Sequence, residues 1–311
     1  MTDVYLDGTL YTIRTALSYV LNDKNMTEYE QAEYDLAINT AKRRTEMATK
    51  CNLVRKSYSV SGAINSISGK PTVGGTGYSL GNILTPSGGT GANVIVSQVA
   101  AGVVTGVYLS PTAVGSGYSV SPVTGTSTTV SPAGGTGCYV NIQRIEPYLT
   151  AGTHTYDFYP IFDLLELAIE GVGSLEKRLG SQLATESTRM LTGEYNTTLY
   201  DWDDDTSGTP DQWMPMAGTL ARLCPTPNLG GTLIAYGYAV SRDLVAETDL
   251  ISTISGELGI QAVMDLAESI LRSQRPALEF NAQYAPLKLQ SWMQYCAQIN
   301  QSQRNQGEFK Y

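Results

Sequence analysis

The stretch Gly75-Thr76-Gly77-Tyr78-Ser79 returns forty residues later as Gly115-Ser116-Gly117-Tyr118-Ser119. A second signature, Gly88-Gly89-Thr90-Gly91-Ala92, returns as Gly134-Gly135-Thr136-Gly137-Cys138. Alternating sequence follows each second signature and is typical of strands, while the glycine clusters supply turns that need a positive φ. We therefore predict two copies of a short β unit of about 40 residues, each packed through its own aliphatic face.

The distribution of charge marks the same region as a separate module. Among the 87 residues from Ser57 to Gln143, Lys70 is the only charged one, and 17 of the 31 glycines of the chain lie there. A shift of composition this sharp indicates a module of its own. We assign residues 59–143 to an inserted all-β module, and residues 1–58 together with 144–311 to the core of the fold.

Outside the module the sequence alternates between helical and strand patterns. Apolar residues at helical spacing from Leu10 to Val20 predict a first helix. The pattern Thr27-Glu28-Tyr29-Glu30 is that of a capping box, in which Thr27 accepts from the backbone N–H of Glu30, and predicts a second helix that runs to about Lys50. Two further amphipathic stretches, from Ile260 to Ile270 and from Leu289 to Ile299, predict helices near the C-terminus.

The middle of the chain is rich in strand patterns. We predict strands over residues 53–60, 154–158, 165–169, 213–217, 219–224 and 232–238, and a short helix over 181–191. The fold class that these elements predict is α+β, with a helical bundle built from the N- and C-terminal helices, a β-rich middle and the inserted all-β module.

Composition excludes several functional classes. The chain has 311 residues, and 29 acidic against 20 basic residues give a net charge of −9. Proteins that grip the DNA backbone need the opposite sign, because they neutralise phosphates. The N-terminus shows no secretory signal and no apolar run is long enough for a membrane span, while the four cysteines are scattered. We therefore expect reduced thiols, a cytosolic site of synthesis and no membrane contact.

Motifs for catalysis or metal binding fail one by one. His154 is the single histidine, and no nucleophile arrangement surrounds it. The acidic run 201–205 resembles the start of a calcium loop, but Thr206 and Gln212 stand where such a loop needs glycine and glutamate. The glycine turns lack the lysine of a phosphate loop, and nothing singles out a pair of carboxylates. We expect no catalytic residue, no metal and no cofactor, so the protein is not an enzyme.

The order of features along the whole chain resembles the head–tail adaptor (connector or neck) proteins of short-tailed bacteriophages. In such adaptors a tryptophan strand, a Pro-x-Pro turn, a tyrosine-rich strand and an acidic loop precede a C-terminal helix. The segments that carry the resemblance are the helices at Leu10–Leu21 and Thr27–Lys50, the stretch 150–160, Gln212-Trp213-Met214-Pro215, Leu223-Cys224-Pro225-Thr226-Pro227, Leu233-Ile234-Ala235-Tyr236-Gly237-Tyr238, Asp243-Leu244-Val245, and the helix from Glu257 onward.

The match covers the chain outside residues 59–143, and the family pattern does not require that insertion. The glycine signatures of the insertion are themselves similar to repeats in phage tail and decoration proteins. The resemblance thus rests on two separate parts of the chain.

The resemblance implies a structural virion protein of the neck or tail that is assembled in the host cytoplasm. It implies a homo-oligomeric ring of about twelve copies between the portal protein and the tail hub or nozzle. DNA would pass through the channel without specific binding, since acidic walls repel phosphate. Tail fibres are a further expected partner. In adaptors the C-terminal segment docks on the portal, which implies portal-binding roles for Arg304, Phe309, Lys310 and Tyr311.

One alternative stays open on the sequence alone. The protein could be a tail or fibre-attachment component whose glycine-rich module binds a host glycan or a fibre. Amphipathic helices at both ends of the chain favour the adaptor, because a ring subunit needs such a bundle. A bacterial surface β protein is a third interpretation, and it lacks the signal sequence that it would need.

Overall fold

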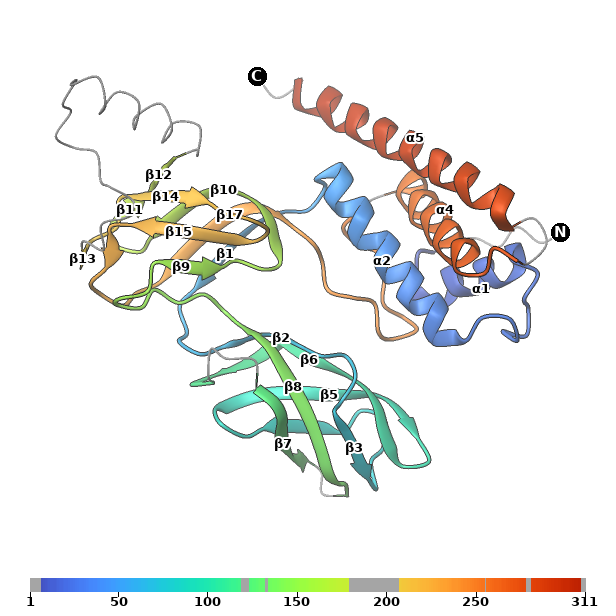
Figure 1. Cartoon of the computed structure of the whole chain (residues 1–311), viewed down its shortest axis with the longest axis horizontal. Helices are drawn as coiled ribbons and strands as arrows, with labels where there is room; N and C mark the ends of the chain where they lie inside the picture. The colour runs from blue at the N-terminus through green and yellow to red at the C-terminus, as the bar shows by residue number, and fades with distance from the viewer. Residues whose placement is uncertain are drawn as a thin grey trace. The chain divides into compact units, whose positions relative to one another are not determined.

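A computed structural model describes residues 7–118, 123–131, 134–178, 207–254, 256–277 and 281–308. The predicted α+β class is confirmed: helices from the two ends of the chain pack together, and the middle consists of several β-sheets (Figure 1). The chain divides into two compact units. The helical unit comprises Met1–Leu53 and Tyr238–Tyr311, and the β unit comprises Val54–Gly237.

The helical unit has one apolar core shared by segments far apart in the sequence. Its helices are α1 (Leu10–Val20), α2 (Gln31–Thr49), α4 (Glu257–Gln274) and α5 (Asn281–Glu308). Apolar side chains from the first two helices and from α4 are buried at the spacing of one helical face. Those with no more than 1 % exposure include Leu10, Ile13, Leu17, Tyr34, Ile38, Ala41, Val263, Leu266, Ala267 and Leu271. The four helices that the sequence predicts are therefore confirmed.

The start of α2 differs from the predicted capping box. Glu30 caps the helix, and its backbone N–H donates to Glu33 Oε2 at 2.8 Å, so the box is formed by these two glutamates and the predicted pair of Thr27 and Glu30 is wrong. The backbone N–H of Thr27 instead donates to Asp23 Oδ1 at 2.7 Å, and that of Tyr29 donates to Asp23 Oδ2 at 2.9 Å. Because the Asp23 carboxylate fixes this loop, the helix begins later than the sequence predicts.

Three small sheets make up one part of the β unit. The first is a four-stranded sheet with the order β1 (Leu53–Tyr58), β17 (Leu233–Ala239), β10 (Ile161–Ile169) and β11 (Gly173–Ser174). The second sheet also has four strands, in the order β12 (Glu176–Lys177), β14 (Gln212–Pro215), β15 (Leu220–Cys224) and β9 (Thr155–Asp157). The third sheet is the pair of β13 (Ser207–Gly208) and β16 (Thr226–Pro227). Each strand that the sequence predicts in the middle of the chain is present, with shifts at its ends. The predicted helix over 181–191 lies outside the described residues.

The glycine-rich stretch forms a seven-stranded antiparallel sheet with the order β2-β8-β7-β4-β5-β6, in which β3 also pairs with β8. Its strands are β2 (Ile64–Ile67), β3 (Val73–Thr76), β4 (Ile83–Pro86), β5 (Thr90–Ala100), β6 (Val103–Ser116), β7 (Val123–Ser131) and β8 (Thr136–Ile145). The strands of both sequence repeats therefore belong to one sheet.

The two repeats do not pack as two separate units, and this part of the prediction is wrong. Strand β3 of the first repeat pairs with β8 of the second, with Val73 opposite Tyr139. Strand β5 of the first repeat pairs with β6 of the second, with Ala92 opposite Val114. Backbone donors and acceptors at each repeat's edges are thus satisfied by the other repeat. Each repeat completes its sheet and its core only in the presence of its counterpart.

The two compact units divide the chain differently from the sequence pattern. The seven strands of the module lie between Ile64 and Ile145. The β unit also contains the three small sheets, whereas the composition of the chain predicts that these belong with the helices in the core of the fold. The division into a module of 59–143 and a core of 1–58 with 144–311 stays a prediction.

Candidate partner-binding surfaces

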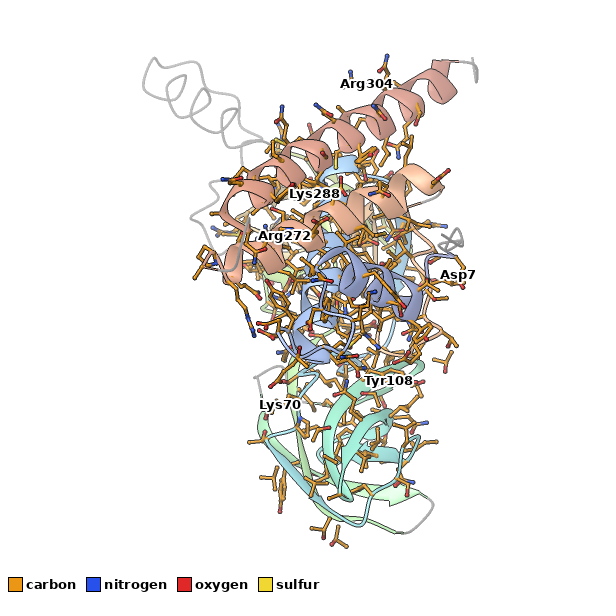
Figure 2. All side chains as sticks on the ribbon, turned by 90° about the vertical axis from the view of Figure 1, so that its right-hand side faces the viewer. Asp7, Lys70, Tyr108, Arg272, Lys288 and Arg304 are labelled. Carbon is orange, nitrogen blue, oxygen red and sulfur yellow. The ribbon has the colours of Figure 1, made fainter. Side chains whose placement is uncertain are left out.

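Ion pairs join helix α5 to α4, and Lys288 and Arg272, the two cations of these pairs, are labelled in Figure 2. Lys288 Nζ of α5 lies 3.2 Å from Asp265 Oδ1 and 3.1 Å from Glu268 Oε2, both on α4. Burial opposes the charge of Lys288, but the hydrogen bond to Glu268 and the charges of both carboxylates outweigh it and raise the pKa of Lys288. Arg272 adds an ion pair with Glu268 at 2.8 Å. The only charged residue in the first five turns of α5 therefore points inward.

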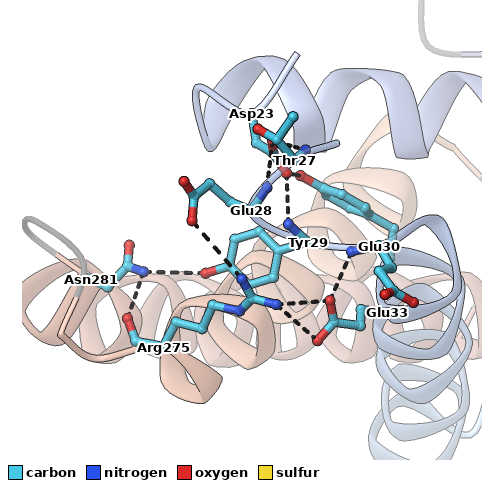
Figure 3. A network of polar contacts seen from close by, with 9 residues as sticks. Asp23, Thr27, Glu28, Tyr29, Glu30, Glu33, Arg275 and Asn281 are labelled. Carbon is cyan, nitrogen blue, oxygen red and sulfur yellow. Dashed lines mark hydrogen bonds and ion pairs between the residues drawn. The ribbon is translucent and has the colours of Figure 1, made fainter. Parts of the chain in front are cut away.

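A second network holds the start of α5 against the start of α2 (Figure 3). The Arg275 guanidinium lies 3.1 Å from Glu33 Oε2 and 3.9 Å from Glu28 Oε2, and it stacks 4.6 Å from the centroid of the Tyr29 ring. Asn281 Nδ2 donates to Tyr29 Oη at 3.2 Å and to the carbonyl of Arg275 at 2.9 Å. The first residue of α5 is thereby tied to the loop before α2 and to the residue that follows α4, which fixes where α5 begins.

The middle of α5 is held on the last turns of α2. Trp292 Nε1 donates to Thr45 Oγ1 at 3.0 Å, and Asn300 Nδ2 donates to the carbonyl of Ala48 at 3.2 Å. Cys296 and Ile299 lie on the same side of α5 and are buried. The inner face of α5 is thus defined from its first residue to Asn300, and the opposite face is open.

Between residues 282 and 303, the open side of α5 carries no charge. We name the α5 outer face by six of its side chains: Leu287, Leu289, Gln290, Met293, Gln294 and Gln298. The three apolar members of this face are 56 %, 36 % and 54 % exposed. An exposed helix normally carries charged residues on its solvent side, and a face made of apolar and amide side chains is instead typical of the core of an interface. The absence of charge is visible in the sequence, where Lys288 is the only charged residue between 282 and 303. The sequence-based predictions nevertheless do not include this face.

The sequence-predicted portal-binding residues are at the end of the same helix. Arg304 is exposed on α5 and lies toward the C-terminal end of the helix, whereas Lys288 lies nearer its start (Figure 2). Ile299 is the last buried side chain described on α5, which continues nine residues beyond it, about 13 Å at the rise of an α-helix. Phe309, Lys310 and Tyr311 lie outside the described residues, so their proximity to Arg304 stays a prediction.

An open pocket of about 580 Å³ lies on one face of the sheet β1-β17-β10-β11. Arg55 of β1, Tyr236 of β17 and Glu166 of β10 line it, and the Ser174 hydroxyl donates to Glu166 Oε1. No histidine, cysteine or lysine is among the described residues that line the pocket. Its charged and hydroxyl groups can hold a ligand by charge and hydrogen bonds.

The described residues hold no group of three or more His, Cys, Asp or Glu side chains that could bind a metal ion. His154 lies next to β9, and its backbone carbonyl accepts from the backbone N–H of Leu223 at 2.7 Å. The acidic run 201–205 lies outside the part of the chain that the structure describes. Over the same described ranges, no helix is both long and apolar enough to cross a membrane.

No protein-family model matches this chain, and no curated protein matches it either. The chain's own surfaces are therefore the evidence for its function.

Proposed function

We propose that this protein is a head–tail adaptor of a short-tailed bacteriophage: a non-enzymatic virion protein that forms a ring between the portal and the tail hub or nozzle. The observation that carries the proposal is the construction of the helical unit. Helices from both ends of the chain share one core. The last of them, α5, has an uncharged outer face up to residue 303 and extends beyond that core to the exposed Arg304 and the end of the helix. The order of elements, with a large β insertion between the helices, supports the same family resemblance.

This construction suits a ring subunit for a physical reason. A subunit in a ring needs a rigid body that meets its neighbours and a segment that reaches a different protein. The contacts of Arg275 with Glu33 and Tyr29 lie beside the start of α5, and the ion pairs of Lys288 join the first part of α5 to α4. Residues 301–304, beyond Ile299 and Asn300, are exposed and therefore accessible to a partner.

The net charge of −9 fits a protein through which DNA passes. Binding to the DNA backbone requires clusters of Lys and Arg that release counterions from phosphates. An acidic lining does not retain DNA, because it repels phosphate at every position along the channel.

We assign portal contact to Arg304, Phe309, Lys310 and Tyr311, by resemblance to adaptors whose C-terminal segment docks on the portal. The test is the mass of the complex formed with the portal ring of the same virus. About twelve copies of the wild-type chain should bind per portal ring. A variant that lacks residues 304–311 should lose binding while its far-UV circular dichroism and thermal unfolding stay unchanged.

Charge reversals make the test independent of a deletion. Arg304→Glu should weaken portal binding, whereas Arg44→Glu, which reverses an exposed charge on α2, should not. A wild-type chain that is folded and does not bind the portal ring overturns the adaptor proposal. Binding of a glycan or a fibre protein by the full chain would then favour the tail or fibre-attachment function.

A further inference from the structure

We infer that the α5 outer face is the surface through which one copy of this chain docks on the next. The occupant that we assign to the face is a second copy of the same chain. The inference deepens the proposed function and rests on it in one respect, since a ring supplies each copy with a neighbour.

The arrangement of the face is that of a helix prepared to pack against another helix. Leu287, Gln290, Gln294 and Gln298 are three or four residues apart and therefore form one ridge along the helix. Leu289 and Met293 are four residues apart and form a parallel ridge beside it. Ridges and the groove between them are the features that interlock when helices pack. The longer ridge runs for about 16 Å, or three turns, and the shorter one covers about 6 Å beside it.

The charge on this face is the decisive feature. Lys288, the single charged residue between 282 and 303, forms ion pairs with Asp265 and Glu268 of the same molecule. Covering the α5 outer face therefore removes no charged group from water, so the interface carries no cost of charge desolvation. Methionine and leucine add apolar area that gains from being covered.

The same property selects a second copy as the occupant. Two copies that each carry a net charge of −9 repel one another, and this repulsion opposes their contact least where neither copy presents a charge. A glutamine side chain both donates and accepts hydrogen bonds, so a ridge of glutamines can pair with uncharged polar groups of an identical chain. A nucleic acid does not fit, because the six residues of the face offer no cation for phosphate.

The test places charges on the face and compares them with the same charges elsewhere. The variant Leu287→Glu/Met293→Glu puts two carboxylates on the α5 outer face. The matched control, Leu36→Glu/Met47→Glu, makes the same two changes on α2, at side chains that are 60 % and 48 % exposed. Association is measured by sedimentation velocity from low to high micromolar concentration, and by counting the copies that load on a portal ring.

The wild type and the α2 control should associate into multiples of 33.5 kDa, in solution or on the portal. The α5 variant should stay monomeric, or load isolated copies, with self-affinity weakened about tenfold or more, because a buried carboxylate has no partner there. Leu287→Lys/Met293→Lys should have the same effect although it lowers the net negative charge, which separates loss of the interface from general repulsion.

Three results would overturn the inference: equal assembly of the α5 variant and the wild type, equal loss in the α2 control, or a wild type that associates neither alone nor on the portal. Failure of the adaptor proposal looks different. In that case the portal takes up no copies, while self-association in solution still depends on the α5 outer face.

Discussion

The ring of Tyr78 lies so close to Gly135 that a Cβ atom at position 135 would be 2.4 Å from Cδ1 of the ring. The other repeat contains the same relationship, since a Cβ atom at Gly89 would be 2.6 Å from Cδ2 of Tyr118. In both cases the tyrosine belongs to the first signature of one repeat and the glycine to the second signature of the other. The tyrosine hydroxyls are also used: that of Tyr78 accepts from the backbone N–H of Cys138 at 3.1 Å, and that of Tyr118 donates to the carbonyl of Pro86 at 3.2 Å.

This geometry predicts that Gly135→Ala destabilises the module. The added methyl group meets an aromatic ring that is buried and cannot move aside, and overpacking of this kind costs about 1–3 kcal/mol. Urea unfolding followed by tyrosine fluorescence measures the change in free energy.

The neighbouring residue provides the control for that measurement. A Cβ atom at Gly134 would meet only the carbonyl oxygen of Gly77, at 3.6 Å, an ordinary contact. Gly134→Ala should therefore change stability by less than about 0.5 kcal/mol. Equal effects of the two substitutions would mean that the Tyr78 ring does not pack on Gly135 as described.

Asp23 gives a prediction that depends on pH. Burial opposes its charge, but the backbone N–H groups of Glu28, Tyr29 and Thr27 donate to the carboxylate and hold the pKa of Asp23 below its usual value of 3.8. Asp23→Asn should therefore lower the unfolding free energy at pH 7 by about 1–3 kcal/mol.

The sign of the pH dependence follows from the lowered pKa. The stabilisation by ionised Asp23 is complete above pH 3.8 and is lost as the pH falls through the lower pKa of the folded state. The difference in stability between wild type and Asp23→Asn should thus be constant from pH 7 to about 5 and shrink in strong acid. A difference that grows on acidification would contradict the assigned hydrogen bonds.

A buried ion pair inside the helical unit gives a third prediction. The Glu46 side chain is fully buried, and its carboxylate accepts from the backbone N–H of Ser241 at 2.9 Å and lies 3.5 Å from Lys42 Nζ. Burial lowers the pKa of Lys42, although the charge of Glu46 acts against this. Glu46→Ala should cost about 3–5 kcal/mol, because it leaves Lys42 buried without its counter-charge.

Removal of both charges separates charge from packing at the same place. The double variant Lys42→Met/Glu46→Leu should be clearly more stable than Glu46→Ala, since no unpaired charge remains. Chemical denaturation of the three proteins measures the order. If the double variant is the least stable of them, then the hydrogen bonds to Ser241 matter more than the charges.

The cysteines predict an order of chemical labelling. Burial raises the pKa of Cys296 to about 11, and the nearby thiol of Cys51 adds to the shift. Cys51 is only half-buried, whereas Cys138, Cys224 and Cys296 are buried. Iodoacetamide at pH 8 should therefore label Cys51 first, as read by peptide mass spectrometry, because the thiolate of an accessible cysteine is the reacting form. In urea all four should react at similar rates.

Sequence reasoning predicted the elements well where a pattern repeats locally. The positions of α1, α4 and the strands follow from apolar spacing, which a helix or a strand imposes on every few residues. The start of α2 was missed because a carboxylate outside the motif, that of Asp23, competes for the N–H groups of the loop. Local patterns cannot report such a competitor.

The candidate surface could be predicted only in part. The family resemblance directed attention to Arg304 and the residues after it, but the α5 outer face needed the knowledge that Lys288 points inward. From the sequence alone, a single lysine in an otherwise uncharged stretch (residues 282–303) is expected to be solvent-exposed, and only its two carboxylate partners on α4 show that it is not.

The sequence alone determined the α+β class, the low charge of residues 57–143 and the existence of two repeats, because periodicity and composition are properties of the chain itself. Only the tertiary structure decided that the repeats interleave, with Tyr78 over Gly135 and Tyr118 over Gly89, and that one face of α5 stays open. Which strand edge is completed by which segment depends on contacts across many tens of residues, and these are set by the satisfaction of backbone hydrogen bonds and the filling of a shared core.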